Sequence, residues 1–392
     1  MKNKALALIL SSLLAISLTS CSDTKENSSS SDNTAETTTA AETVSEQTTE
    51  TSTEMTTEKP TAPPIEYYDG LTYPDTMTDK ERENTSYREF TLLYPEKAFQ
   101  IGVNRLSYGI PQETGDAVHK KVKSIEENIR ELKIYDEQLD AGFLSHIILP
   151  PDYDENKEYP VFLVCDAEYW LTKLPDAWQL INEGEAAPVI FVTLGYDYDT
   201  DGVDDNVRYD KFAVKQDKML DFITNDLMQL ISANYKVDSS RSVLFGHSLG
   251  GLFSHYALCN SDRYEYQPFA NYIIASPALW SYYYDSGDKM DLKSISDPYA
   301  YRNEFGYFDR NETMDKKVFI CAGENETYRF RNQKPEEYAD LPTIPEDAKS
   351  VYERLSAHGV SADLMIYENS YHRSYVGNML CEYLKQNFPP NN

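Results

Sequence analysis

Residues 241–259 read RSVLFGHSLGGLFSHYALC, and the rest of the chain is organised around this stretch. The apolar run at 243–245 predicts a buried strand, and the residues after Ser248 predict a helix. A serine on so sharp a strand-to-helix turn takes strained dihedrals, and side chains two positions away on either side would collide with the turn. Glycines stand at both positions, Gly246 and Gly250. The stretch therefore predicts a nucleophile elbow with Ser248 at its tip.

The helix after this turn would point its N-terminal amides, and the positive end of its dipole, at an oxyanion forming beside the serine. One N–H is expected from Leu249, the residue after the nucleophile. The other is expected from the loop after the predicted strand 161–165, which places it at Ala167 or Glu168.

A serine in such an elbow needs an acid after a later strand and a histidine in the last loop. Of the six histidines, His372 alone follows the last predicted strand, so we predict that it is the general base. The loop after the strand 318–321 contains Glu326, which we predict to be the acid that orients the imidazole. The alternatives for the acid are Glu324, Asp285 and Asp288.

The first part of the chain has the composition of a targeting segment and a linker. Residues 1–21 combine two lysines, an apolar run and a terminal Cys21, which is typical of a lipoprotein signal whose cysteine is acylated. Residues 22–64 are rich in Ser, Thr and Glu and predict a disordered linker. Residues 65–119 are expected to form an irregular extension. These features predict an extracytoplasmic protein that is anchored to the membrane by lipid alone.

Charge and cysteine content exclude several classes of function. The chain has 392 residues and a net charge of −29, which argues against nucleic acid and anionic lipid as partners. Four cysteines remain besides Cys21, and they are expected to be buried hydrophobic residues, although their spacing does not decide the disulfide state. No CxxC or His-rich cluster suggests a metal, and we expect no cofactor. The oligomeric state cannot be read from the sequence.

Strands and helices alternate along residues 120–392, which predicts one catalytic domain of the α/β class with a mostly parallel sheet covered by helices on both faces. The predicted strands are 132–139, 143–149, 161–165, 188–194, 243–245, 272–275, 318–321 and 364–367. The predicted helices are 177–185, 217–235, the one after Ser248, 345–358 and 375–388.

Several motifs together resemble a known family. They are PPDY at 150–153 leading into YPV at 159–161, GHSLGG at 246–251, SPALW at 276–280 and GENE at 323–326. This combination resembles the putative-esterase family of α/β hydrolases, which includes esterase D, enterochelin-type siderophore esterases, and feruloyl and acetyl-xylan esterases. The resemblance implies an α/β-hydrolase fold and a serine esterase with no cofactor. The chain departs from the family at Ala167, where glycine is usual.

The leading hypothesis for function is a serine esterase that acts on carbohydrate-linked esters of the acetyl or feruloyl type. The segment 280–308 falls where such folds grow a lid, and it is rich in tyrosine, whose flat apolar faces suit sugar rings and aryl acids. The candidates for substrate binding are Trp280, Tyr282, Tyr283 and Arg329. Siderophore hydrolysis, acyl transfer on the same scaffold, and a glycan-binding module are the alternatives.

Overall fold

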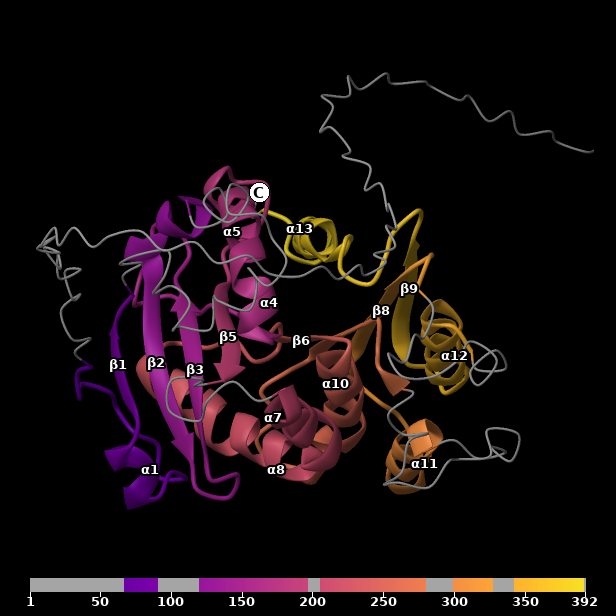
Figure 1. Cartoon of the computed structure of the whole chain (residues 1–392), viewed down its shortest axis with the longest axis horizontal. Helices are drawn as coiled ribbons and strands as arrows, with labels where there is room; N and C mark the ends of the chain where they lie inside the picture. The colour runs from indigo at the N-terminus through magenta and orange to yellow at the C-terminus, as the bar shows by residue number, and fades with distance from the viewer. Residues whose placement is uncertain (1–66, 91–119, 197–204, 280–298, 327–341, 391–392) are drawn as a thin grey trace, which may run out of the picture. The chain divides into compact units, whose positions relative to one another are not determined.

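The computed structural model describes residues 67–90, 120–196, 205–279, 299–326 and 342–390. The predicted signal segment with Cys21 and the predicted linker lie outside these residues. A nine-stranded sheet crosses the described part in the order β1-β2-β3-β5-β4-β6-β7-β8-β9 (Figure 1).

The sheet is antiparallel at one edge and parallel elsewhere. The antiparallel strands are β1 (Ser86–Glu89), β2 (Ile129–Asp136) and β3 (Ala141–Ile148), and β3 pairs antiparallel with β5 (Ile190–Tyr196). The strands that run parallel to β5 are β4 (Val161–Cys165), β6 (Val243–His247), β7 (Asn271–Ala275), β8 (Lys317–Gly323) and β9 (Ser361–Tyr367). The carboxyl ends of these six strands meet at one edge of the sheet, where open α/β sheets bind their ligands.

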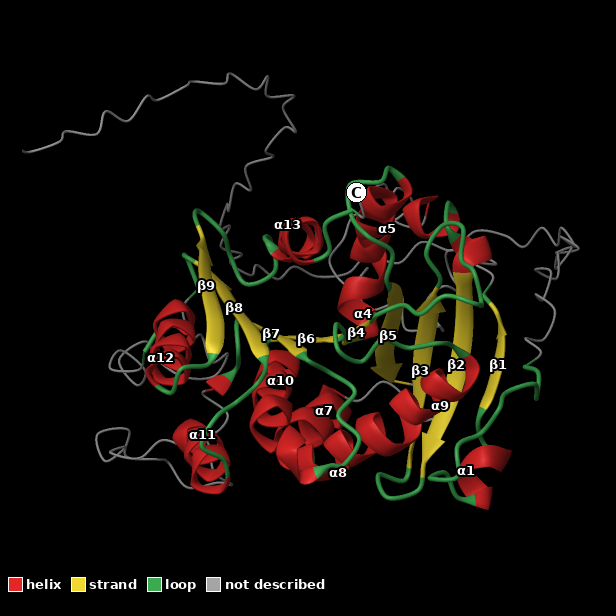
Figure 2. Cartoon of the chain, turned by 180° about the vertical axis from the view of Figure 1, so that it is seen from behind, coloured by secondary structure: helices red, strands yellow, loops and turns green. Residues whose placement is uncertain are grey.

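Helices cover both faces of the sheet, as Figures 1 and 2 show from opposite sides. One face carries α4 (Ala167–Trp170), α5 (Leu174–Asn182) and α13 (Val376–Asn387). The other carries α7 (Asp205–Tyr209), α8 (Gln216–Asp221), α9 (Met228–Asn234), α10 (Leu249–Asn260), α11 (Tyr299–Arg310) and α12 (Ile344–Ala357). No helix in the described ranges is both long and apolar enough to cross a membrane. The prediction of an α/β fold with a mostly parallel sheet and helices on both faces is confirmed.

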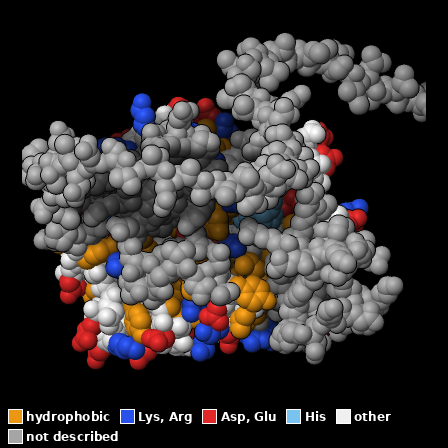
Figure 3. Space-filling view, viewed as in Figure 1, with side chains coloured by type: hydrophobic (Ala, Val, Ile, Leu, Met, Phe, Trp, Pro, Cys, Tyr) orange, Lys and Arg blue, Asp and Glu red, His pale blue; other side chains and the backbone are white. Residues whose placement is uncertain are grey.

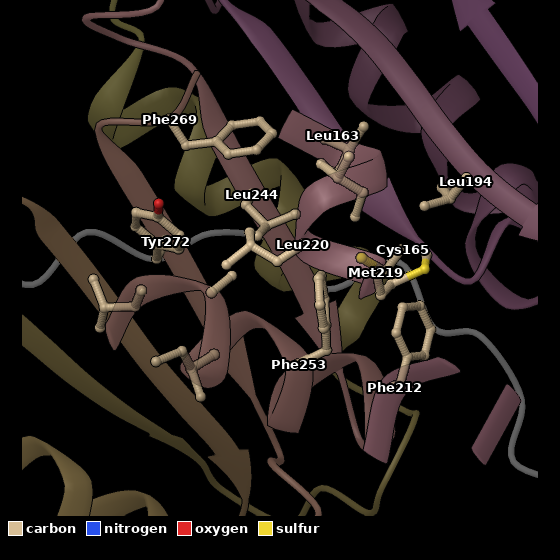
Figure 4. Close-up of a cluster of buried hydrophobic side chains, with 14 of the residues drawn as sticks. Leu163, Cys165, Leu194, Phe212, Met219, Leu220, Leu244, Phe253, Phe269 and Tyr272 are labelled. Atoms are coloured by element: carbon tan, nitrogen blue, oxygen red, sulfur yellow. The ribbon is translucent and has the colours of Figure 1, made fainter. Parts of the chain in front are cut away.

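The central strands are buried on both faces because their side chains supply two cores at once. All five residues of β4 are buried, and successive side chains enter opposite cores, Leu163 on one side and Phe162 and Val164 on the other. Figure 4 shows Leu163, Leu244 and Met219 among the apolar side chains of the first core. Strands buried on both faces have no polar alternation, which is why they read as unbroken apolar runs.

Residues 67–90, which belong to the predicted irregular extension, contain the short helix α1 (Asp79–Glu83) and the edge strand β1. The polar sequence SYRE of β1 gives no apolar signal. Its place depends on a distant charge, because the Arg88 guanidinium donates to the buried Glu131 carboxylate of β2 at 2.8 Å. The pattern of apolar and polar residues near β1 in the sequence cannot reveal an ion pair with a residue of another strand.

The predicted helix 217–235 is also interrupted, because six of its residues form the π-helical segment η6 (Phe222–Leu227) between α8 and α9. Such segments arise where one extra residue is fitted into a helix, and a periodicity of 3.6 residues does not show them.

Three buried carboxylates meet where α1, the end of β2 and η6 come together. Glu81, Asp136 and Asp226 each place an oxygen within 4.8 Å of the others. Burial and the charges of Glu81 and Asp136 raise the pKa of Asp226 to about 8. Burial also raises the pKa of Asp136, which is hydrogen-bonded to Asp226. Asp226 therefore carries a proton at neutral pH and shares it with Asp136.

This proton makes the folded state sensitive to alkali. A carboxyl group whose pKa is raised in the folded state favours folding as long as it keeps its proton. Its contribution to the free energy of unfolding is complete below the unfolded pKa of about 4 and is lost as the pH rises through about 8. Asp226→Asn keeps a neutral side chain at every pH. We expect the melting temperature of the unchanged protein to fall relative to that of the variant between about pH 5 and pH 9, measured by circular dichroism. A constant difference between the two proteins across this range would contradict the assignment.

Candidate active site

Ser248 occupies the turn between β6 and α10 with φ 60° and ψ −116°, a strained conformation for a residue other than glycine. A Cβ atom on Gly246 would lie 1.9 Å from the carbonyl oxygen of Gly250, so only glycine fits there. A Cβ atom on Gly251 would lie 2.5 Å from the carbonyl oxygen of Ala275 at the end of β7. The Ser248 amide donates to that same carbonyl at 3.0 Å. The glycines thus allow the close approach that builds the turn.

His372 lies in the loop after β9 and meets the carboxylate of Glu326. Its Nδ1 is 2.6 Å from Glu326 Oε2. The Glu326 side chain is fully buried, whereas that of His372 is 41% exposed. A buried carboxylate at Nδ1 holds the ring in the tautomer that leaves Nε2 free to accept a proton.

Two further donors hold the Glu326 carboxylate in place. Its Oε1 accepts from the Ser276 hydroxyl and from the Gly323 amide, each at 2.6 Å. The Ser276 oxygen is also 2.5 Å from the Tyr375 hydroxyl, and burial raises the pKa of that tyrosine well above its usual value. Sequence reasoning did not identify Ser276 or Tyr375 as part of the site. Two signals pointed to Ser276: it directly follows β7, and it is the first residue of the SPALW motif.

Glu324, the alternative acid, has a different partner. Its Oε2 accepts from the Asn369 amide at 2.8 Å, so it braces the loop that carries His372 without contacting the imidazole. The other two alternatives, Asp285 and Asp288, lie outside the described residues. Geometry therefore favours Glu326 over Glu324 as the partner of the histidine.

Ser248 and His372 line the same pocket, which has a volume of about 130 Å³. Figure 3 shows histidine surface and basic surface close together on the face that it presents. The serine, the histidine and the buried carboxylate are arranged for general-base activation of a nucleophile. The remaining lining residues are Tyr169, Trp170, Arg208, His247 and Arg373.

Two arginines of the pocket were not predicted, because segments distant in the sequence bring them there. Arg208 of α7 makes a bidentate ion pair with the fully buried Asp166, at 2.5 and 2.8 Å. Arg373 follows His372 and is exposed. Both guanidinium groups lie 5.4 Å from the centroid of the Tyr169 ring, within the range of cation–π contacts.

The predicted oxyanion donors lie at the first turns of two helices, where α-helical N–H groups have no partner within the helix. Leu249 begins α10 and Ala167 begins α4. The two turns are adjacent, since a Cβ atom on Gly250 would lie 2.9 Å from the carboxylate of Asp166, the residue before Ala167. Asp166 itself is left-handed, with φ 62°.

Glu168 is less suited than Ala167 to supply the second N–H. Its carboxyl group interacts with its own amide and accepts from the Tyr196 amide at 2.8 Å. Burial and the nearby Asp166 charge raise the pKa of Glu168 to about 8, so this acid is largely neutral at pH 7. The carboxyl group thus ties α4 to β5, which leaves Ala167 as the better-placed donor.

The predicted substrate-binding residues lie outside the described part of the chain: Trp280, Tyr282, Tyr283 and Arg329. Among the described residues, the one group of acidic, histidine or cysteine side chains spaced closely enough to share a metal ion is the Glu81, Asp136 and Asp226 cluster. These three residues do not line the pocket. The described cysteines are free thiols: Cys165, Cys259, Cys321 and Cys381.

Comparison with protein families places most of the described part in one group. The family model described as "Putative esterase" matches residues 143–385. The chain is similar to ferri-bacillibactin esterase BesA of Bacillus subtilis, with 26% identity over 159 residues that cover 40% of this chain and 45% of that protein. It is also similar to a siderophore triacetylfusarinine C esterase of Aspergillus fumigatus, with 38% identity over 65 residues that cover 16% of this chain and 21% of that protein. The matches thus span less than half the length of these two relatives.

Among solved structures, the siderophore hydrolase EstB from Aspergillus nidulans superimposes with a TM-score of 0.51. The sequence identity is 18%, and the match covers 67% of this chain and 96% of that chain. At this level the similarity concerns the fold, which is that of the α/β hydrolases.

Substitution of each of the two glutamates in the 323–326 loop is expected to change kcat to a different extent. We expect Glu326→Gln to lower kcat about 10³- to 10⁴-fold, because an amide at Nδ1 favours the wrong tautomer of His372. Glu324→Gln, the matched control in the same loop, is expected to change kcat by less than about fivefold, because the Glu324 carboxylate accepts from the Asn369 amide and not from the imidazole. Steady-state kinetics on an aryl ester measures both. Equal losses would show that the carboxylate at Nδ1 does not govern activity.

Proposed function

The chain belongs to the putative-esterase family, and on this premise we propose that it is a serine hydrolase of carboxylic esters that works through an acyl-enzyme. The observation that carries the proposal is that Ser248 and His372 share one pocket while Glu326 holds the far side of the imidazole at 2.6 Å. Nucleophile, base and orienting acid are the three parts that ester hydrolysis by serine requires.

The reaction follows from the positions of these groups. His372 takes the proton from Ser248 as the serine oxygen attacks the ester carbonyl, and the tetrahedral oxyanion accepts hydrogen bonds from the amides of Leu249 and Ala167. Each such donor contributes about 10²- to 10³-fold in kcat in enzymes of this kind. The protonated histidine then gives its proton to the leaving alcohol. Water, activated by the same histidine, hydrolyses the acyl-serine and restores the enzyme.

For the substrate, we propose an ester that carries an anionic group, of the kind found in siderophores. Arg373 lines the pocket and is exposed, so it presents a positive charge where an anionic group of the substrate would lie. Arg208 is held in a bidentate pair with Asp166 and shapes the wall. Two sequence relatives are named for siderophore esters, which supports the same substrate class.

The esters linked to carbohydrate, which the tyrosine-rich segment favours, remain the second substrate class. The aryl ring of a feruloyl group would suit the aromatic wall formed by Tyr169 and Trp170. The residues that led to this hypothesis lie mostly outside the described part of the chain. Acyl transfer to an alcohol would use the same groups, and a pure glycan-binding role would leave the Ser248, His372 and Glu326 constellation without a use.

A panel of esters tests the reaction and the substrate together. It contains a ferric siderophore ester, a feruloylated and an acetylated oligosaccharide, a neutral aryl acetate and a long-chain triglyceride. We expect Ser248→Ala to abolish hydrolysis of every member while the melting temperature changes little, because its side chain serves chemistry. Retention of more than a few per cent of kcat by the variant would remove Ser248 from the mechanism.

Arg373→Gln separates the substrate classes on the same panel. A lost charge contact should raise KM for the anionic ester about tenfold and leave the neutral aryl acetate within about twofold. Arg263→Gln, at an arginine that does not line the pocket, is the matched control. Faster turnover of the oligosaccharide esters than of the siderophore ester would favour the carbohydrate substrate.

We also propose that the protein is held outside the cytoplasm by lipid on Cys21, because its sequence context is that of an acylated cysteine. Cys21→Ser should release the protein from the membrane fraction into the aqueous fraction, as measured by detergent phase partitioning of cells that express each form. Unchanged partitioning into detergent would exclude this anchor.

A further inference from the structure

His247, the residue before the nucleophile, contacts the backbone of the general base. Its Nε2 is hydrogen-bonded to the carbonyl oxygen of His372, and the two ring centroids lie 4.5 Å apart. A carbonyl oxygen can only accept, so Nε2 of His247 carries the hydrogen. The His247 ring therefore acts as a donor to the main chain of the loop after β9.

The His247 ring is neutral when it makes this contact. Burial, and secondly the nearby charge of His372, lower the pKa of His247 well below its usual range. Other charged groups that face it are Arg208 and Arg373, which act in the same direction. Neutrality matters because His372 becomes positively charged during catalysis, and a second charge at this distance would oppose it.

Neighbouring residues hold both the side chain and the backbone carbonyl of His247. Its side chain is buried beneath Trp170, whose ring meets it edge-on at 4.9 Å. Its backbone carbonyl accepts from Arg208 at 3.3 Å, and Arg208 is itself held by Asp166. The donor to His372 thus projects from a rigid strand end next to Ser248.

The loop that carries His372 is braced by Glu324 and by the Ser370 carbonyl, which accepts from the Asn325 amide, but neither contact reaches the imidazole. The His372 side chain is 41% exposed, and the bond at Nδ1 to Glu326 holds one point of its ring. A ring held at one atom can still pivot with its loop. The contact from His247 holds the carbonyl of the same residue, so His372 is held at both its ring and its main chain.

We propose that His247 is a positioning residue for the general base, coupling the nucleophile turn to the loop that carries His372. The inference rests on the proposed function, since it assumes that Ser248 and His372 react together. Gly246 and Gly250 on either side of Ser248 serve the turn itself, and the geometry assigns His247 a separate task.

His247→Phe tests the inference, because it keeps a buried ring and removes the N–H donor. We expect kcat on the aryl acetate to fall about 10- to 100-fold with KM within about twofold, as small misplacements of a catalytic group typically cost this much. His247→Gln keeps an N–H at a similar reach and should recover kcat to within about fivefold of the unchanged enzyme. His255→Phe is the matched control, since His255 is a buried histidine of α10 that bonds Glu304 at 2.8 Å and does not line the pocket. It should lower the melting temperature and leave kcat per folded molecule unchanged.

A second measurement does not depend on turnover. The proton between His372 Nδ1 and Glu326 should give a far-downfield NMR resonance in the unchanged protein and in His247→Gln, and this resonance should broaden or shift in His247→Phe. If His247→Phe does not fold, His247→Asn replaces it, because its amide is too short to reach the carbonyl and the same changes are expected.

Two results would overturn the inference. One is wild-type kcat in folded His247→Phe, and the other is an unaltered His372 resonance in that variant. Failure of the proposed function has a different signature, in which the unchanged protein hydrolyses no ester of the panel while the resonance still responds to His247→Phe.

Discussion

The close approach of the β6–α10 turn to its own helix is the constraint on which the rest of the site depends. Ser248 is held at φ 60° and ψ −116°, which costs roughly 1–3 kcal/mol for a residue with a side chain. The turn persists because its neighbours fix it: the Ser248 amide donates to Ala275, and the Ser248 carbonyl accepts from the amide of Ala278. The strained turn is thereby tied to β7 as well as to its own helix.

The other residues of the site lie at the carboxyl ends of the neighbouring parallel strands, at the same edge of the sheet as Ser248. Asp166 and Ala167 follow β4, His247 ends β6, Ser276 follows β7, and the residues after β8 and β9 supply Glu326 and His372. Each of these groups follows or ends a strand whose residues are buried in the core or paired in the ladder, so the strands fix where each loop begins. Buried ion pairs such as that of Arg208 and Asp166 then join loops that the strands do not connect.

Within the described part, the charge of the groups around the pocket depends on burial and ion pairing more than on the net charge of the protein. The chain has a net charge of −29, yet its pocket is lined by two arginines and carries no ionised carboxylate at its mouth among the described residues. Asp166 is neutralised by Arg208, and Glu168 holds its proton because burial raises its pKa. The exposed Arg373 thus places a positive charge at the pocket of a protein whose net charge is negative.

The sequence by itself determined the elbow, the α/β class, and the place of most strands and helices, because these depend on local signals. Glycines on either side of Ser248, apolar runs in strands buried on both faces, and amphipathic spacing are all short-range patterns. The chain order of serine, acid and histidine also followed from the sequence. Spacing alone could not decide between Glu324 and Glu326, since both stand in one loop.

Only the tertiary structure decided which distant side chains meet. It joined Glu326 to His372, gave Glu324 a backbone partner, and brought Arg208 and Arg373 to one tyrosine. It also placed β1 at the edge of the sheet, although its polar residues carry no strand signal. These contacts join residues that are far apart in the chain. Such pairings depend on the packing of whole elements, and a side chain's type and its near neighbours in sequence do not encode them.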